Sequence, residues 1–397
     1  MISLDEALAT VDRVLEGRTV SCETLSIREA HGRILAEDRY SKLDLPPFHK
    51  SAMDGYAVLE GDVRDAYRVI ETVPAGKVPA QKLAPGAAVR IMTGAPVPEG
   101  TGRVIMIEDT DGGHDTVRVW RHDDRPNICK KGEDIHAGDL VAPAGTTLDA
   151  MAIANVVSCG IASVSVRRRI RVAIIPTGDE IVEHFEDLTP GKIMDSNTPM
   201  LAALAHEHGL EIVSSIHVPD VMDELVNVIG RGAELADMLL LSGGVSAGDF
   251  DFVPEALQHA GFTIHFDSVA VQPGRPMTFA ARDDCVALGM PGNPVSVFLS
   301  FHLYARRVAA RLSGAPPPTR SFEVRLEKEF ERKRGDRAGF LPCRINASGH
   351  AEVLAFHGSA HLLSLGMADG FLHIPQGMTS MPAGSTAGFY PLMPVRR

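Results

Sequence analysis

The feature that most constrains the fold is a regular alternation of strand-like and helix-like segments between residues 170 and 313. Apolar runs such as IRVAIIP and DMLLL are typical of buried strands, and amphipathic stretches of helical length separate them. Strands that alternate with helices in this way predict a parallel, doubly wound sheet. The ligand site of such a sheet is expected outside the carboxyl ends of its strands.

The remaining sequence predicts three further parts, so the chain is expected to be an α/β multidomain protein. Helices are expected at residues 3–16, with a capping box formed by Ser3 and Glu6, at 28–35 and at 148–159. Between the last two of these helices lies a Pro- and Gly-rich sequence with short β-type runs, which is typical of an inserted β-rich domain. The expected domains are a helical linker (1–43 plus 139–169), the insert (44–138), the doubly wound domain (170–314) and a C-terminal β-barrel or sandwich (319–397).

Charge and cysteine content limit the classes of partner. The formal net charge of −12 argues weakly against nucleic acid or an anionic membrane as the main partner. The five cysteines form no CxxC pair, which excludes the usual zinc and iron–sulfur spacings and fits a reducing compartment. We therefore expect a cytoplasmic protein without a membrane span. The basic runs RRRIR (167–171) and KRGDR (333–337) are interpreted as a solvated edge at a domain joint and an exposed turn.

Four loops of the doubly wound region carry the residues that suggest chemistry. They are PTGDE (176–180), MDSN (194–197), LSGGVSAGDFD (241–251) and MPGNPVS (290–296). Glycine lets backbone N–H groups approach an anion, and the helix that begins at Pro294 adds a favourable dipole. The acids in these loops are hard oxygen donors suited to Mg²⁺ beside a phosphate. Each loop alone is typical of an ordinary turn, but the four together predict one anion-binding crevice.

Two segments of the insert are notable as well. SAMDGYAV places Asp54 in a tight turn before a strand, and RIMTGAPVPEG places Thr93 and Gly94 at the end of another. An ordinary turn explains each segment when it is taken alone.

Taken in order, PPFHKSAMDGYAV, RIMTGAPVP, IPTGDEIV, MDSN, LLSGGVSAGDFD, QPGRP and LGMPGNPVSV resemble the molybdopterin molybdenumtransferase family, relatives of the gephyrin E domain. The resemblance covers essentially the whole chain. It implies a homodimer of four-domain subunits in which the linker domain dimerises and the active site is shared between subunits. It also implies molybdenum insertion from molybdate into adenylylated molybdopterin, with release of AMP and a requirement for Mg²⁺. The adenylyltransferase that supplies this substrate is a further candidate partner.

The resemblance assigns roles to individual residues. It implies catalytic roles for Asp54, Thr93, Glu180 and Asp251, of which the first two act across the dimer. It implies metal ligands at Glu180, Asp249 and Asp251. Substrate-binding roles are expected of Asp195, Asn197, Ser242, Gly243, Gly244, Ser246, Arg275, Pro291, Gly292, Asn293, Pro294, Arg344 and Ser359, with Asp220 as a further acid.

The sequence departs from the family where it commonly carries lysines. Ser268 and Gln272 occupy two such positions, while Arg275 keeps one cation. His49 and Lys50 replace the usual Asp-Asn before SAMDGYA, so Lys50 brings back one positive charge. These differences leave two alternatives open. One is a catalytically silent molybdopterin-binding or scaffold relative, and the other is a nucleotide-pyrophosphate hydrolase or adenylyltransferase on the same doubly wound fold.

Overall fold

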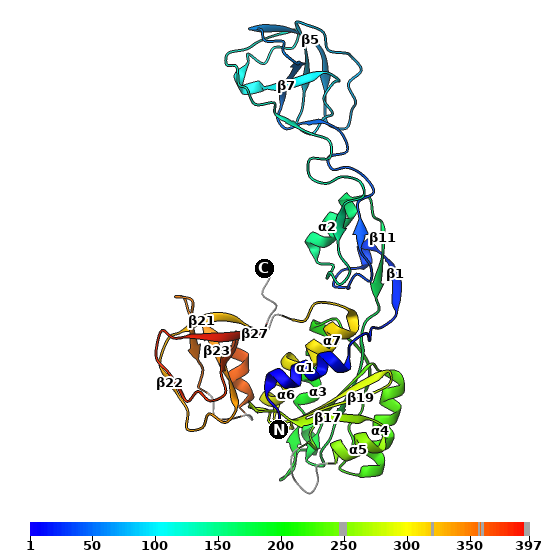
Figure 1. Ribbon diagram of the computed structural model, residues 1–397, viewed down its shortest axis with the longest axis vertical. Helices are drawn as coiled ribbons and strands as arrows, with labels where there is room; N and C mark the ends of the chain where they lie inside the picture. The colour runs from blue at the N-terminus through cyan, green and yellow to red at the C-terminus, as the bar shows by residue number, and fades with distance from the viewer. Residues whose placement is uncertain (246–251, 319–320, 356–357, 359–360, 393–397) are drawn as a thin grey trace. The chain divides into compact units, whose positions relative to one another are not determined.

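The structure is a computed structural model that describes residues 1–245, 252–318, 321–355, 358 and 361–392. It contains two compact units (Figure 1). Unit 1 comprises Met1–Glu23, Gly32–Ala36 and Arg167–Arg397, and unit 2 comprises Thr24–His31 and Glu37–Val166. No helix in the described part of the chain is both long enough and apolar enough to cross a membrane.

The centre of unit 1 is a six-stranded sheet in the order β15-β12-β16-β20-β19-β17. Its strands are β12 (Arg171–Pro176), β15 (Glu211–Ser215), β16 (Met238–Ser242), β17 (Thr263–Ser268), β19 (Pro276–Arg282) and β20 (Cys285–Met290). The first four strands in this order are parallel, as expected of a doubly wound sheet. The last two are antiparallel, which corrects the expectation of a wholly parallel sheet. Short connections join β17, β19 and β20, and parallel neighbours would need long crossovers.

Helices cover both faces of this sheet (Figure 1). They are α1 (Leu4–Val14), α3 (Asn197–Glu207), α4 (Met222–Leu235), α5 (Val253–His259), α6 (Pro294–Ser300), the π-helical turn η4 (Phe301–Ala305) and α7 (Arg306–Ser313). The core on one face joins α1, α3, α6 and α7 to Val172 and Ile174, while α4 and α5 pack on Ala173 and Ile175. Successive strand residues thus face opposite cores, which explains why these strands are apolar throughout.

The predicted start of the first helix is confirmed. The Ser3 hydroxyl accepts from the backbone N–H of Glu6 at 3.2 Å, and Glu6 Oε2 accepts from the backbone N–H of Ser3 at 2.8 Å. Further along, Asp12 pairs with Arg307 and Arg311. Helices α1 and α7 are therefore joined by ion pairs in addition to their contacts in the apolar core.

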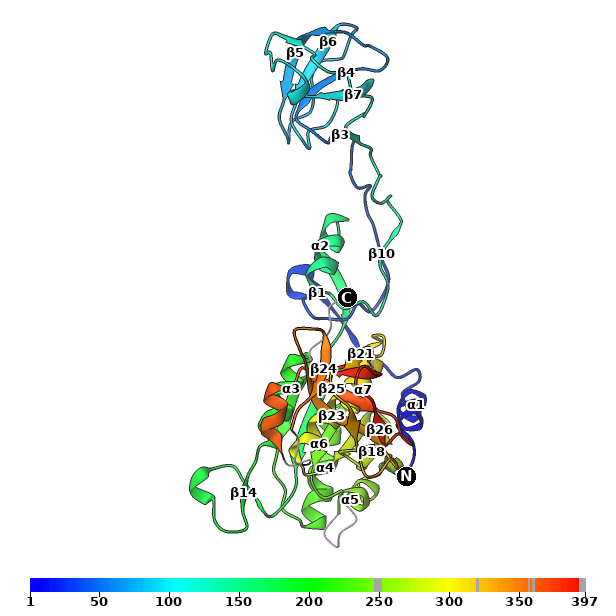
Figure 2. The same ribbon diagram turned by 90° about the vertical axis from the view of Figure 1, so that its left-hand side faces the viewer.

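The C-terminal part of unit 1 is a closed β-barrel. Its elements are β21 (Phe322–Leu326), β22 (Phe330–Glu331), β23 (Ala338–Ile345), β24 (His350–Val353), η5 (Leu362–Met367), β25 (Gly370–Ile374), β26 (Ser380–Met381) and β27 (Thr386–Pro391). Pairing of β23 with β25 closes the order β23-β24-β21-β27-β25 into a barrel. One additional strand, β18 (Val271–Gln272), belongs to the QPGRP segment and pairs in parallel with β23 (Figure 2). This pairing joins the doubly wound part to the barrel.

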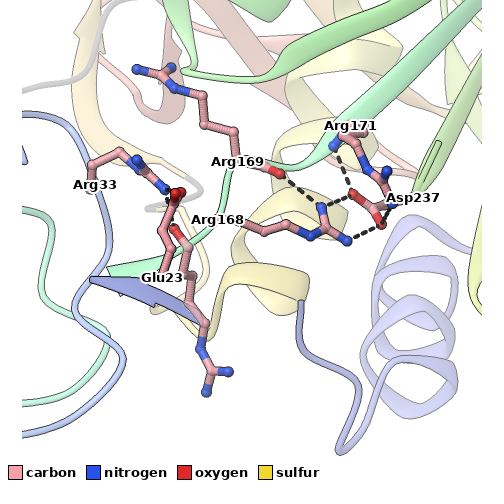
Figure 3. Close-up of polar contacts among 7 residues, drawn as sticks. Glu23, Arg33, Arg168, Arg169, Arg171 and Asp237 are labelled. Atoms are coloured by element: carbon pink, nitrogen blue, oxygen red, sulfur yellow. Dashed lines mark hydrogen bonds and ion pairs between the residues drawn. The ribbon is translucent and has the colours of Figure 1, made fainter. Parts of the chain in front are cut away.

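The arginine run at 167–171 is only partly the solvated edge that the sequence predicts (Figure 3). Arg169 is exposed, but the Arg168 side chain is 26% exposed and is paired. Arg168 Nη1 and Nη2 donate to the two carboxylate oxygens of Asp237 at 2.6 and 2.7 Å, and the backbone N–H of Arg171 donates to Asp237 at 2.7 Å. Asp237 is buried, and its hydrogen bond raises the pKa of Arg168. Arg33 pairs with Glu23 on the other side of the run. These contacts fix the entry of the chain into β12.

Unit 2 contains a five-stranded sheet in the order β7-β4-β6-β5-β8. Its strands are β4 (Gly55–Leu59), β5 (Ala66–Val73), β6 (Ala87–Ile91), β7 (Thr101–Met106) and β8 (Thr116–Arg118), followed after β7 by the turn η2 (Ile107–Asp109). Strand pairs form from β3 (Lys50–Ser51) with β9 (Ile128–Cys129), and from β2 (Arg39–Tyr40) with β10 (Leu140–Ala142). The predicted β-rich character of this region is therefore confirmed.

The helices expected beside this β-rich region fare differently. The helix predicted at 148–159 is α2 (Ala150–Ser158), and Asp149 caps it by accepting from the backbone N–H of Ala152 at 2.9 Å. The prediction of a helix at 28–35 is wrong, because only the 3₁₀ turn η1 (Ile27–Glu29) forms there. The backbone at Gly32 has a φ of +72°, which a continuing right-handed helix cannot contain. Strands β1 (Cys22–Ser26) and β11 (Ser163–Arg167) pair with each other.

Candidate functional site

A cleft of about 630 Å³ lies in unit 1, at the carboxyl ends of β12, β16 and β20. This is the edge at which ligand sites occur in doubly wound sheets. Its lining comes from three of the four predicted loops, from the QPGRP segment, from the segment between β15 and α4, and from the barrel. The described residues that line it are Thr177, Gly178, Glu180, Asp220, Gly243, Gly244, Val245, Gln272, Pro273, Gly274, Arg275, Pro276, Pro291, Gly292, Asn293, Ser296, Arg337 and Gly358.

Backbone hydrogen bonds hold the loops after β12, β16 and β20 together. The N–H of Thr177 donates to the carbonyl of Ser242 at 2.9 Å, and the N–H of Gly243 donates to the carbonyl of Met290 at 3.1 Å. Gly243 and Gly244 have φ values of +95° and +62°, and a β-carbon at position 243 would lie 2.5 Å from the Thr177 carbonyl oxygen. The close approach of these loops therefore requires glycine at position 243.

Two hydroxyls beside this turn have no hydrogen-bond partner among the described residues. The side chains of Thr177 and Ser242 are almost completely buried, and neither Oγ atom is paired. Buried polar groups in folded proteins are nearly always paired, so an unpaired one is a candidate ligand contact. Of the two residues, Thr177 lines the cleft and Ser242 does not.

The MDSN loop supports the cleft without lining it. Asp195 Oδ1 accepts from the backbone N–H of Thr198 at 3.0 Å, within the first turn of α3. Asn197 is buried, and its Nδ2 donates to the carbonyl of Gly292 at 2.8 Å. Two residues predicted to bind substrate therefore position the PGNP loop and the start of α3. In the PGNP loop itself, Asn293 and Pro294 occupy the N-cap and first position of α6.

Among the described residues, two acids and two arginines line the cleft. Glu180 follows the buried Gly178, where φ is +135°, and its carboxylate lies directly over that glycine. Asp220 lines the cleft and was a weaker prediction from the family resemblance. Arg275 was predicted, whereas Arg337 was not, since its KRGDR run was interpreted as an exposed turn. A basic residue directly before a strand-like run, as in DRAGFL, was the available signal.

The two residues singled out in the insert are neighbours within unit 2. Thr93 donates to Asp54 Oδ1 twice, from its backbone N–H at 2.7 Å and from its hydroxyl at 2.7 Å. The backbone hydrogen bond, followed by that of the hydroxyl, lowers the pKa of Asp54. The Asp54 carboxylate is thereby held in its ionised form between the start of β4 and the end of β6.

Other predicted residues lie away from the cleft or cannot be placed. Arg344 Nη2 forms an ion pair with Glu352 at 2.8 Å on the barrel and does not line the cleft. Ser246, Asp249, Asp251 and Ser359 lie outside the described residues.

The acids of the cleft allow a test of the expected magnesium ion. No group of three or more His, Cys, Asp or Glu side chains that could hold a metal occurs in the described ranges. Mg²⁺ commonly takes only one or two protein carboxylates and completes its octahedron with water and substrate phosphate. Glu180 and Asp220 line the cleft as hard oxygen donors and fit this mode of binding.

Comparisons with known proteins agree with this architecture over nearly its whole length. Three family models match: "MoeA N-terminal region (domain I and II)" at residues 2–160, "Probable molybdopterin binding domain" at 173–311, and "MoeA C-terminal region (domain IV)" at 323–392. A crystal structure of the molybdopterin biosynthesis moeA protein from Pyrococcus horikoshii OT3 is similar, with a TM-score of 0.84 and 29% identity. The match covers 98% of this chain and all of that one.

Curated relatives give the same result by sequence. Molybdopterin molybdenumtransferase 2 of Mycobacterium tuberculosis is 34% identical over 377 residues, which cover 91% of this chain and 93% of that protein. Molybdopterin molybdenumtransferase of Haemophilus influenzae is 33% identical over 405 residues, which cover 98% of both chains. The chain therefore belongs to the molybdopterin molybdenumtransferase family.

Proposed function

We propose that this protein inserts molybdenum from molybdate into the dithiolene of adenylylated molybdopterin and releases AMP. The observation that carries the proposal is the convergence of the loops after β12, β16 and β20 on one cleft. A pyrophosphate needs backbone and side-chain donors at close range, and glycine turns with an unpaired hydroxyl supply them. Names of relatives that share this architecture support the same reaction.

The proposed roles of the cleft residues follow from their charge: cationic and hydroxyl side chains bind anionic groups, and acids bind the metal ion. Arg275 can hold an anionic group of the substrates, while Thr177 can donate to a phosphate oxygen. Glu180, with Asp220 as a second donor, would hold Mg²⁺, whose chemistry is to neutralise the phosphates of the anhydride. Asp251 and Asp249 remain proposed ligands from the family resemblance, and they lie outside the described residues.

AMP release by the purified protein tests this proposal. Adenylylated molybdopterin and Mg²⁺ are incubated with the protein, with and without molybdate, and AMP is quantified by chromatography. We expect release that depends on molybdate and falls at least about 100-fold in Glu180→Gln, because the cleft loses its carboxylate at this position. Glu183→Gln is the matched control, since Glu183 is exposed and does not line the cleft.

Each alternative function has its own signature in the same assay. Tight binding of the substrate without AMP release under any oxyanion would exclude an enzyme and leave a binding protein. Hydrolysis of ordinary nucleotide pyrophosphates at comparable rates would instead indicate a general pyrophosphatase.

We propose further that two copies associate and that Asp54 and Thr93 act on substrate bound by the partner copy. Helix α2 supports association, because only Val156 in it is buried while Met151 and Val157 are 68% and 50% exposed. Light scattering of Met151→Glu tests this. A monomer is expected for the variant, and an unchanged dimer would place the contact elsewhere.

We propose as well that the protein is cytoplasmic. All five cysteines are free thiols, which supports a reducing, cytoplasmic location.

A further inference from the structure

A second cavity of unit 1, with a volume of about 30 Å³, is lined by helical residues on one side and barrel residues on the other. Leu8 of α1 and the run from α6 to α7 form the helical side, and Phe371 and Tyr390 belong to the barrel. None of its described lining residues is an acid, and none lines the larger cleft. A cavity of this size holds about two water molecules or one small ion.

Two of the lining residues, His302 and Arg306, form a hydrogen-bonded pair. His302 lies in the π-helical turn η4, and Arg306 is the first residue of α7. Arg306 Nη1 is 3.3 Å from His302 Nδ1. Since an arginine can only donate, Nδ1 accepts, and the neutral imidazole must carry its proton on Nε2. The ring is neutral because burial, and then the charge of Arg306, lower the pKa of His302 to about 3.

The N–H group of His302 Nε2 has no acceptor. The Nε2 atom is buried and has no hydrogen-bond partner among the described residues. Arg306 is partly buried as well, and burial lowers its pKa. It forms no ion pair in the described part of the chain, where His302 is its only side-chain hydrogen-bond partner. The pair therefore presents donors without acceptors, which is costly in a desolvated place.

The neighbouring ionisable groups do not supply the missing negative charge. Arg307 also lines the cavity, but it is paired with Asp12. The ring of His208 lies 6.0 Å from that of His302, and burial followed by the charge of Arg306 lowers the pKa of His208 to about 4. His208 is thus neutral near pH 7. Among the described lining residues, Arg306 is left as the one cation without a carboxylate partner.

We infer that this cavity binds one small monovalent anion, a halide such as chloride, between the Arg306 guanidinium and the His302 Nε2–H group. The volume admits a monatomic anion, and the single unneutralised cation matches a single negative charge. A second negative charge would be buried without compensation against leucine and aromatic walls. Because barrel residues line the other side of the cavity, the bound anion would connect the barrel to the helices. This binding site is independent of the proposed reaction.

Thermal unfolding of the full-length protein tests the inference. Chloride or bromide replaces gluconate at constant ionic strength, since gluconate is too large for the cavity. The Tm of the wild type should rise by about 2 °C or more, because an anion that binds only the folded state stabilises it. Arg306→Met should lose this response, and His302→Phe, which keeps a ring but no N–H group, should respond less.

Arg334→Met is the matched control, because Arg334 is exposed and does not line the cavity. It should respond to chloride like the wild type, which separates binding in the cavity from general effects of the salt. In gluconate, Arg306→Met should be at least as stable as the wild type, because it removes a partly buried charge that has no carboxylate partner. A lost response in this variant then reports lost binding and not lost folding.

Chloride binding is measured directly from the linewidth of the ³⁵Cl NMR resonance, which broadens when chloride exchanges with a protein site. At chloride concentrations below saturation, the broadening by Arg306→Met should be at least about tenfold smaller than that by the wild type and Arg334→Met. Equal broadening by all three proteins, or an equal chloride response of their Tm values, would overturn the inference. A rise in Tm with formate but not with chloride or bromide would overturn the assignment to a halide.

Discussion

Asn197 Nδ2 donates to the backbone carbonyl of Gly292 at 2.8 Å, and this bond joins the MDSN loop to the PGNP loop. Asn197 stands at the start of α3, and Gly292 lines the cleft just before α6. A side chain that the family resemblance assigns to substrate binding thus holds a backbone segment that lines the cleft. Replacing a residue that only holds the loop should lower stability as well as substrate binding. Replacing a residue that contacts the substrate should mainly affect binding.

Replacing Asn197 tests the bracing role. Asn197→Ala leaves the Gly292 carbonyl without its donor, so we expect a loss of about 1–2 kcal/mol in the free energy of unfolding. The KM for adenylylated molybdopterin should rise because the PGNP loop loses its support. Urea denaturation and steady-state kinetics measure the two effects. Thr198→Val is the control, since the Thr198 hydroxyl is buried and unpaired and braces no loop. Equal stability of Asn197→Ala and wild type would contradict the prediction.

The unpaired hydroxyl of Thr177 should serve binding at the expense of stability. Thr177→Val removes a buried polar atom that has no partner in the described structure, so stability should stay equal or rise by up to about 1 kcal/mol. The KM for the pyrophosphate substrate should nevertheless increase severalfold. Thr278→Val removes a comparable unpaired hydroxyl from β19, away from the cleft, and should leave the KM unchanged. An unaltered KM in Thr177→Val would remove this hydroxyl from the site.

Two glycine-to-alanine changes should act in opposite directions. Gly243→Ala puts a β-carbon 2.5 Å from the Thr177 carbonyl oxygen at a φ of +95°, so it should cost about 1–3 kcal/mol and impair substrate binding. Gly230→Ala, inside α4 with nothing within 4 Å of the new β-carbon, should stabilise the protein by about 0.5–1 kcal/mol. Thermal unfolding of both variants provides the comparison. A stabilised Gly243→Ala would show that the loops can separate without penalty.

Acid should weaken the contact between α1 and α7. Burial alone raises the pKa of Asp12, but hydrogen bonds from Arg311 and Arg307 outweigh burial and lower it to about 2. Because the pKa is lower in the folded state, the unfolded chain takes up the proton first as the pH falls. The stabilisation is complete above the ordinary pKa of about 3.9, and roughly 2 kcal/mol is lost as the pH approaches 2. Denaturation between pH 5 and pH 2.5 should show most of this loss in the wild type.

Asp12→Asn provides the comparison for that titration. The variant should be less stable near neutral pH, because Arg307 is left buried without its carboxylate partner. Its stability should then depend less on pH than that of the wild type over the same interval. Parallel pH profiles for the two proteins would assign the acid sensitivity to other carboxylates.

Local patterns determined most of the architecture. The capping box at Ser3, the helix that begins at Pro294 and the apolar runs of the parallel strands each depend on residues a few positions apart. The switch-point rule then placed three loops at one edge of the sheet. Such features could be predicted because backbone preference and burial periodicity act over short distances along the chain.

Pairing between segments that are distant in sequence decided where several charged side chains lie. The ladder between β18 and β23 brings Arg337 to the cleft, and the contact with Asp237 leaves the Arg168 side chain only 26% exposed. Arg344 shares the barrel strand β23 but pairs with Glu352 away from the cleft. Sequence records that these residues are charged but not which strand will lie beside them. That depends on how separately formed surfaces pack, because close packing and hydrogen-bond register are properties of the assembled chain.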